Sequence, residues 1–250
     1  MFRRFSALLA VVAAVAATSP CILPSAPAAD TITLQAAKDN TLFESATGSL
    51  SNGSGDGMFA GTIMGGQRRR ALIAFVIAGH IPDGAAIQSV QLILSMSRTS
   101  VGSRSVRLHR VLAEWGEGTS DAGGGGGGQG AAATTNDATW IHTFFNGSLW
   151  SNPGGDFVAS PSAEIQVAGL GSYTWGSTQG MIADVQAWLD GRGSNFGWIL
   201  VGDELGTPPS TKRFDTHEHP VAANRPQLVV EFTGSAVAAG TWSGIKHLYR

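Results

Sequence analysis

The chain has 250 residues, a formal net charge of −2 and a charged fraction of only 14%. This balance argues against nucleic-acid binding, which requires a strongly basic face. The only cysteine, Cys21, lies in an N-terminal segment that reads as a signal peptide, so the mature chain is expected to have neither a disulfide nor a thiolate metal site. The remaining length, roughly 220 residues, is typical of one β-rich domain.

The N-terminal segment has the pattern of a secretory signal peptide spanning residues 1–28. Two arginines precede an apolar stretch at 7–17, which is too short to cross a bilayer, and residues 26–28 form an A-x-A cleavage site. We therefore expect a secreted or cell-surface protein. The alternative is a lipoprotein signal with lipid attached to Cys21, although Pro20 beside that cysteine matches such a signal poorly. No later apolar run approaches the ~20 residues of a membrane helix, so no transmembrane segment is expected.

Short apolar or alternating segments, bounded by Gly, Pro, Asn, Asp or Ser, predict strands throughout the rest of the chain. In chain order the predicted strands span residues 31–36, 42–44, 58–63, 71–78, 86–96, 104–112, 196–201, 211–216 and 227–233. Strands without regular intervening helices predict an all-β fold, an antiparallel β-sandwich of jelly-roll type. We expect a single domain over residues 29–233 and a disordered tail over 234–250.

One segment, residues 177–190, predicts a short helix that packs at an end or edge of the sandwich. Met181, Val185 and Trp188 recur at helical spacing. Ser177 is the predicted N-cap, and Gly191 is predicted to end the helix in a left-handed conformation.

Several motifs, in order, resemble the bacterial DNRLRE-domain family. They are KDNTLFE, RRALIAF followed by IPDGAAIQSVQLIL, VRLHRVLAEWGEGTSD, and KRFDTHEHPVAANRPQLVVEFT. The resemblance runs from about residue 31 to 233. It implies a secreted, non-catalytic β-sandwich module with carbohydrate-binding relatives. It supplies neither a ligand nor site residues for this chain.

Two sets of polar residues are candidate metal ligands. On a continuous strand, Asp215, His217 and His219 would share one face, where two imidazoles and a carboxylate suit Zn²⁺; the alternative is an exposed edge strand with ordinary ion pairs. Hard oxygen donors form the second set, which would suit Ca²⁺ if they meet at one end of the sandwich, or else serve as turn and cap carboxylates. These donors are Asp39, Asn40, Glu44, Asp203 and Glu204. Ca²⁺ is thus a candidate cofactor, although the sequence by itself assigns no cofactor.

Aromatic and basic residues in predicted loops are candidates for binding a glycan. Trp140, Trp150 and Trp175 lie in Gly- or Ser-bounded segments and could stack on sugar rings, unless they are buried against the sandwich. Arg69, in the basic run 68–70, could contact an anionic polysaccharide or form internal salt bridges.

The sequence thus favours a secreted, non-catalytic module that binds extracellular or cell-surface polysaccharide. The alternatives are a structural or adhesive surface protein without a small-ligand site, and a polysaccharide-active lyase or hydrolase. For the enzyme, Glu114 could pair with Glu117 or Asp121, but the spacing identifies no catalytic residue.

Overall fold

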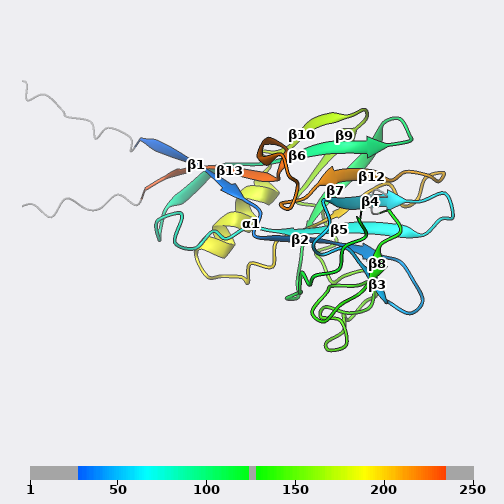
Figure 1. Cartoon of the computed structure of the whole chain (residues 1–250). Coiled ribbons are helices and arrows are strands. Elements are labelled where there is room, and N and C mark those ends of the chain that lie inside the picture. The colour runs from blue at the N-terminus through cyan, green and yellow to red at the C-terminus, as the bar shows by residue number, and fades with distance from the viewer. Residues whose placement is uncertain (1–27, 124–127, 235–250) are drawn as a thin grey trace, which may run out of the picture.

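The computed structural model describes residues 28–123 and 128–234. The predicted signal peptide up to residue 27, with Cys21, and the predicted tail from residue 235 lie outside these residues. The described chain is built of antiparallel strands with one short α-helix, which confirms the all-β prediction (Figure 1). No helix in these residues is long and apolar enough to cross a membrane.

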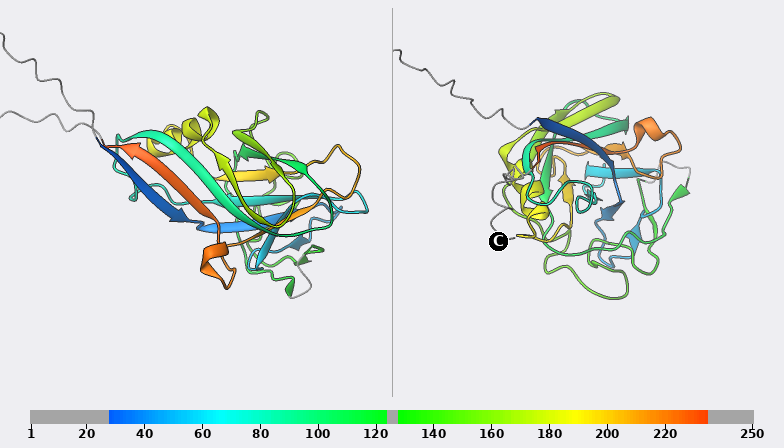
Figure 2. Two further views of the ribbon diagram at one scale, coloured as in Figure 1. Left: turned by 90° about the horizontal axis from the view of Figure 1, so that it is seen from above. Right: turned by 90° about the vertical axis from the view of Figure 1, so that its left-hand side faces the viewer.

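Two curved sheets pack face to face. The first contains β1 (Ala29–Gln35), β4 (Gly57–Thr62), β6 (Ala86–Thr99), β10 (Gly171–Gly176), β12 (Lys212–Asp215) and β13 (Gln227–Thr233). The second contains β2 (Lys38–Phe43), β5 (Arg68–Ala74), β7 (Arg104–Arg110), β9 (Ala163–Val167) and β11 (Trp198–Val201). The first and last strands, β1 and β13, pair at one end of the molecule (Figure 2).

Strand β4 connects the two sheets. Its first four residues pair with β12 of the first sheet, whereas Gly61 and Thr62 pair with β5 of the second. Gly61 has a φ of 119°, and a Cβ at this position would lie 2.8 Å from the carbonyl oxygen of Ser210. Glycine therefore permits the bend by which one strand serves both sheets.

Alternate residues of the second sheet face two different cores. Ala71, Ile73 and Leu200 belong to the core between the sheets, while Leu72 and Ile199 belong to a second core on the outer face. The long loops between residues 112 and 158 cover that outer face, together with the two-stranded ribbon of β3 (Leu50–Ser51) and β8 (Ala131–Ala132) (Figure 1). The chain thus has a third layer made largely of loops.

The helix α1 (Gln179–Leu189) packs against β6 through Met181, Val185 and Trp188, as its spacing predicted. Its N-cap is Thr178, whose hydroxyl accepts a hydrogen bond from the Met181 N–H at 3.1 Å. The predicted cap, Ser177, accepts from the Val90 N–H at 3.0 Å instead and ties the helix start to β6. Gly191 adopts the expected left-handed conformation, with a φ of 65°. A short 3₁₀ helix (Ala222–Asn224) precedes β13.

Candidate functional site

The three loop tryptophans weighed as a glycan platform are buried. Trp175 is fully buried between the sheets, and Trp140 and Trp150 are each 5% exposed in the outer core. The Arg68 and Arg70 guanidinium groups lie over the Trp140 ring, 4.9 and 5.0 Å from its centroid. None of these rings presents an open face for a sugar, so the burial alternative describes them.

The basic run 68–70 is engaged inside the protein. Arg68 forms two hydrogen bonds to the Glu44 carboxylate, and Arg70 forms two to the Glu204 carboxylate, both at 2.7 Å. Arg69 is buried over the Phe43 ring. The Arg68 hydrogen bonds lower the pKa of Glu44 below its usual value. Arg68 and Arg70 therefore form internal salt bridges with Glu44 and Glu204, whereas Arg69 donates to the backbone carbonyls of Gly128 and Arg68.

The proposed oxygen-ligand set for Ca²⁺ does not converge. Asn40 is a buried crosslink: its Oδ1 accepts from Ser51 and from two backbone N–H groups, and its Nδ2 donates to the Glu117 carbonyl. Asp203 accepts from the Gly206 N–H and lies 3.7 Å from Arg104. Of this set, only Asp39 remains in a cluster that could hold an ion.

The residues 215–219 do not form one strand face. Strand β12 ends at Asp215, and the chain then turns, with a hydrogen bond from the His219 N–H to the Thr216 carbonyl. Asp215 pairs with Arg213, and the His219 Nε2 lies 3.7 Å from its other oxygen. The turn directs His217 elsewhere, toward Asp39.

Asp39, Glu117, His217 and Glu218 form a cluster that we call the acidic histidine cluster. The His217 Nδ1 lies 3.0 Å from Asp39 Oδ2 and 3.6 Å from Glu117 Oε1. The opposite ring nitrogen, Nε2, lies 3.1 Å from Glu218 Oε1. Backbone groups fix the arrangement, because the Asp39 N–H donates to Glu117 Oε1 at 2.7 Å and the His217 N–H donates to Asp39 Oδ2 at 2.9 Å.

The acidic histidine cluster has strong internal electrostatics. The Asp39 hydrogen bond raises the pKa of His217 to about 9. Burial raises the pKa of Glu218 to about 7 and also raises the pKa values of Asp39 and Glu117. Three carboxyl groups thus face a single imidazole in a partly desolvated site.

The sequence indicated two members of this cluster, Asp39 and His217, but assigned them to different sites. From the sequence, Glu117 was considered only as a catalytic partner of Glu114. In the structure Glu114 forms a salt bridge with Lys38 at 2.7 Å, whereas Glu117 lies beside His217. Glu117 lies 78 residues from Asp39 in the chain, and no local pattern predicts that contact.

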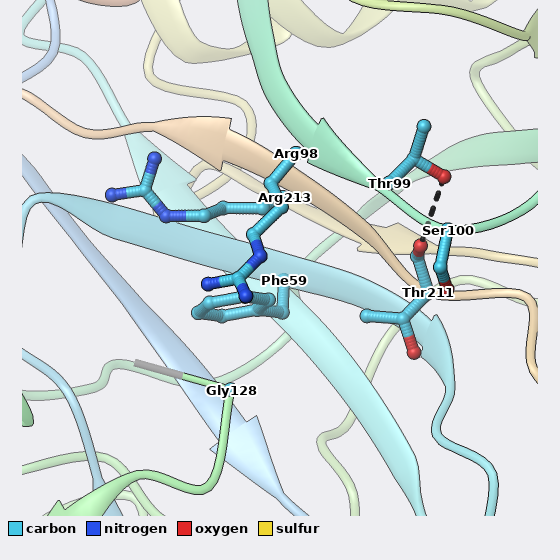
Figure 3. A pocket seen from close by; sticks show the side chains of 7 residues that line it. All are labelled: Phe59, Arg98, Thr99, Ser100, Gly128, Thr211 and Arg213. Carbon is cyan, nitrogen blue, oxygen red and sulfur yellow. Dashed lines mark hydrogen bonds between the residues drawn. The ribbon is translucent and has the colours of Figure 1, made fainter. Parts of the chain in front are cut away.

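A second candidate site is a pocket on the first sheet, with a volume of about 240 Å³. Phe59, Arg213 and Arg98 are cross-strand neighbours on β4, β12 and β6, so they form a row across three strands. Figure 3 shows one of the two guanidinium groups over the Phe59 ring and the other pointing away from it, with Thr99, Ser100 and Thr211 grouped at the other end of the pocket. We call this the arginine pocket.

Arg213 is a fixed side chain of the arginine pocket. Its guanidinium group bonds Asp56 at 2.7 Å and Asp215 at 2.9 Å, which holds it in place. Its Nε is buried and has no hydrogen-bond partner among the described residues. Arg98 is exposed at the rim, and the pocket is lined by two guanidinium groups, hydroxyl groups and one aromatic ring.

No model of a known protein family matches the chain, and no curated protein matches it.

Proposed function

We propose that the protein is a secreted, non-catalytic β-sandwich module that binds an acidic extracellular or cell-surface polysaccharide. The arginine pocket carries this proposal. Guanidinium groups bind carboxylate or sulfate oxygens through paired N–H donors, and hydroxyl side chains match sugar hydroxyls.

The placement of the arginine pocket supports a role in recognition. It lies on regular strands, and Asp56 and Asp215 hold Arg213 in one orientation before any ligand arrives. A fixed guanidinium group loses little side-chain entropy on binding. The pocket is also partly open to solvent, which suits one or two residues of a long polymer better than an enclosed small molecule.

Two features of the sequence agree with this role. The N-terminal pattern is that of a secretory signal, which would deliver the protein to the extracellular polysaccharides. The ordered motifs resemble a family of secreted modules with carbohydrate-binding relatives. Both support the proposal independently of the pocket.

The test is binding of polygalacturonate, a uronic-acid polymer, compared with a neutral glucan, by isothermal titration calorimetry. We expect the acidic polymer to bind with a dissociation constant below about 1 mM, more weakly as salt rises because screening reduces the charge–charge attraction. Arg98→Gln should weaken binding about tenfold, the effect of losing roughly 1.4 kcal/mol of charge-assisted hydrogen bonding.

The matched control is Arg192→Gln, which removes an exposed arginine that pairs with Asp190 beyond the end of α1. It should bind like the unaltered protein. Equal loss in both variants would show only a general charge effect, and no binding of either polymer at millimolar concentration would favour the structural or adhesive role. New reducing or unsaturated sugar ends after incubation would overturn the non-catalytic assignment.

A further inference from the structure

We propose that Asp39, Glu117 and His217 form a binding site for a divalent transition-metal ion of the Zn²⁺ type. This site is separate from the arginine pocket and does not depend on polysaccharide binding. Each of the three residues offers one ligand atom, and these atoms all lie within 4.8 Å of one another.

The first argument is the spacing of the donor atoms. Ligand atoms about 2.0–2.1 Å from a tetrahedrally coordinated Zn²⁺ lie about 3.3 Å from one another. The His217 Nδ1 is 3.0 Å from Asp39 Oδ2 and 3.6 Å from Glu117 Oε1, values on either side of that spacing. Small side-chain movements would bring all three atoms into contact with one ion.

The second argument is a buried oxygen with no partner. Asp39 is completely buried, and its Oδ1 has no hydrogen-bond partner among the described residues, although its Oδ2 accepts a hydrogen bond from the His217 backbone N–H. A buried carboxylate oxygen without a donor is costly, because it has lost its water without a replacement. A bound cation would compensate both oxygens of this carboxylate.

The third argument is the position of Glu218. It contacts the His217 Nε2 at 3.1 Å, on the side of the ring opposite Nδ1. Histidines that bind metals almost always donate their other ring N–H to a carboxylate, carbonyl or water, which fixes the tautomer and the orientation of the ring. Glu218 is therefore the positioning residue, and Nδ1, which faces Asp39 and Glu117, is the nitrogen that would bind the ion.

The donor set distinguishes among metals. Ca²⁺ takes about six to eight oxygen ligands at 2.3–2.6 Å, and an imidazole is a poor ligand for it. Two carboxylates and one imidazole suit Zn²⁺ and related borderline ions. The site would join β2, the loop at 117 and the turn after β12, so the bound ion would fix the loop layer to the first sheet.

The test is Zn²⁺ binding to the EDTA-treated full chain, measured by competition with a chromophoric chelator. We expect one ion per chain with a dissociation constant below about 10 µM, equivalent to roughly 7 kcal/mol. Saturating Zn²⁺ should raise the melting temperature, because it binds only the folded state. NMR should show the His217 Nδ1, rather than Nε2, shifting when the metal is added.

The variants distinguish residues that bind or position the ion from residues outside the site. His217→Gln and Glu117→Gln should each weaken Zn²⁺ binding at least about 100-fold, and Glu218→Gln should weaken it about 10- to 100-fold, as is typical when the carboxylate partner of a ligating histidine is lost. His80→Gln, which removes an exposed histidine outside the cluster, should leave the affinity unchanged. Glu117 is partly exposed, so its variant tests the site even if the His217 variant fails to fold.

Three results would overturn the proposal. One is the absence of Zn²⁺ binding at 1 mM, and another is unchanged affinity in both His217→Gln and Glu117→Gln. The third is preferential binding of Ca²⁺ that Zn²⁺ does not displace. The Arg98→Gln variant should retain Zn²⁺ binding, so failure of the polysaccharide proposal would leave this result unaffected.

Discussion

His109 on β7 is a histidine whose surroundings favour the neutral form. It is 5% exposed, its Nδ1 lies 2.9 Å from the Val158 carbonyl oxygen, and its ring packs 5.1 Å from the Phe157 ring. Burial lowers the pKa of His109 below its ordinary value of 6.5. The imidazole is therefore neutral in the folded protein at neutral pH, with the proton on Nδ1 donated to the carbonyl.

This environment predicts a loss of stability in mild acid. The unfolded chain binds a proton at His109 near pH 6.5, whereas the folded chain does so only at lower pH. The stabilisation that comes from the lowered pKa of His109 is thus complete above pH 6.5. It is lost as the pH falls through 6.5 toward the pKa of the folded state. His109→Phe should flatten this dependence and lower the free energy of unfolding at pH 8 by about 1–2 kcal/mol, because the Val158 carbonyl loses its donor.

Urea unfolding at pH 8, 6.5 and 5 would measure the effect. The exposed-histidine variant His80→Gln is the control and should keep the pH dependence of the unaltered protein. An equal pH dependence in His109→Phe and the unaltered protein would contradict the assignment.

The burial of an apolar residue can be predicted from the sequence, whereas the burial of a charged residue often cannot. The helical spacing of Trp188 and the apolar strand around Trp198 predict that both are core residues, and their ring centroids lie 4.6 Å apart in the inner core. Lys212 is the opposite case. It was considered part of an exposed edge strand, but it is fully buried, and its Nζ lies within hydrogen-bond distance of three backbone carbonyls and the Thr99 hydroxyl. The sequence cannot predict such a cage, because its acceptors come from loops distant in the chain.

β4 passes from the first sheet to the second at Gly61. Replacing this glycine therefore tests the bend of a whole strand rather than a single side-chain contact. Gly61→Ala would force a positive φ on a residue with a Cβ and place that atom 2.8 Å from the Ser210 carbonyl oxygen. We expect the free energy of unfolding to fall by at least about 2 kcal/mol, the cost of backbone strain added to a backbone clash.

Gly66→Ala is the matched control for this prediction. Gly66 also has a positive φ, 84°, but a Cβ there would meet no atom within 4 Å. It should cost only the backbone strain, about 1 kcal/mol. Equal costs for the two variants in urea unfolding would show that the bend at Gly61 tolerates a side chain.

Elements with strong periodicity were predictable, and weakly patterned ones were not. The alternation of apolar residues over 86–96 predicted β6. The observed strand begins at the predicted residue and continues past residue 96 to Thr99. The strand predicted at 71–78 instead begins at Arg68 and ends at Ala74, because salt-bridged arginines extend it at the start. The strands β9 and β10 were missed, since β10 is mostly exposed and has little apolar alternation.

At the scale of the whole molecule, the loop layer was the largest feature absent from the prediction. The sequence predicted two sheets and one core, and it read residues 139–150 as loops that could display aromatic rings. The structure buries these rings in a second core on the back of the second sheet. The same layer carries Glu117 to the acidic histidine cluster, so missing the layer also meant missing the site.

The two cores share the strands that separate them, and we therefore expect them to unfold together. Successive residues of β5 and β11 point to opposite faces: Ile73 and Leu200 pack in the inner core, and Leu72 and Ile199 pack in the outer core. Unfolding of either core would disrupt the strands on which the other core depends. Trp150→Ala should lower the free energy of unfolding by about 3–5 kcal/mol, the usual cost of removing a large buried aromatic side chain.

The transition should nevertheless remain single in urea. Tryptophan fluorescence and far-UV circular dichroism should report the same midpoint, both before and after the substitution. Leu149→Ala, which alters the neighbouring residue whose side chain is 60% exposed, should change stability by less than about 0.5 kcal/mol. Two separate transitions in Trp150→Ala would show that the loop layer is an independent unit, and the metal site would then join two parts that unfold separately.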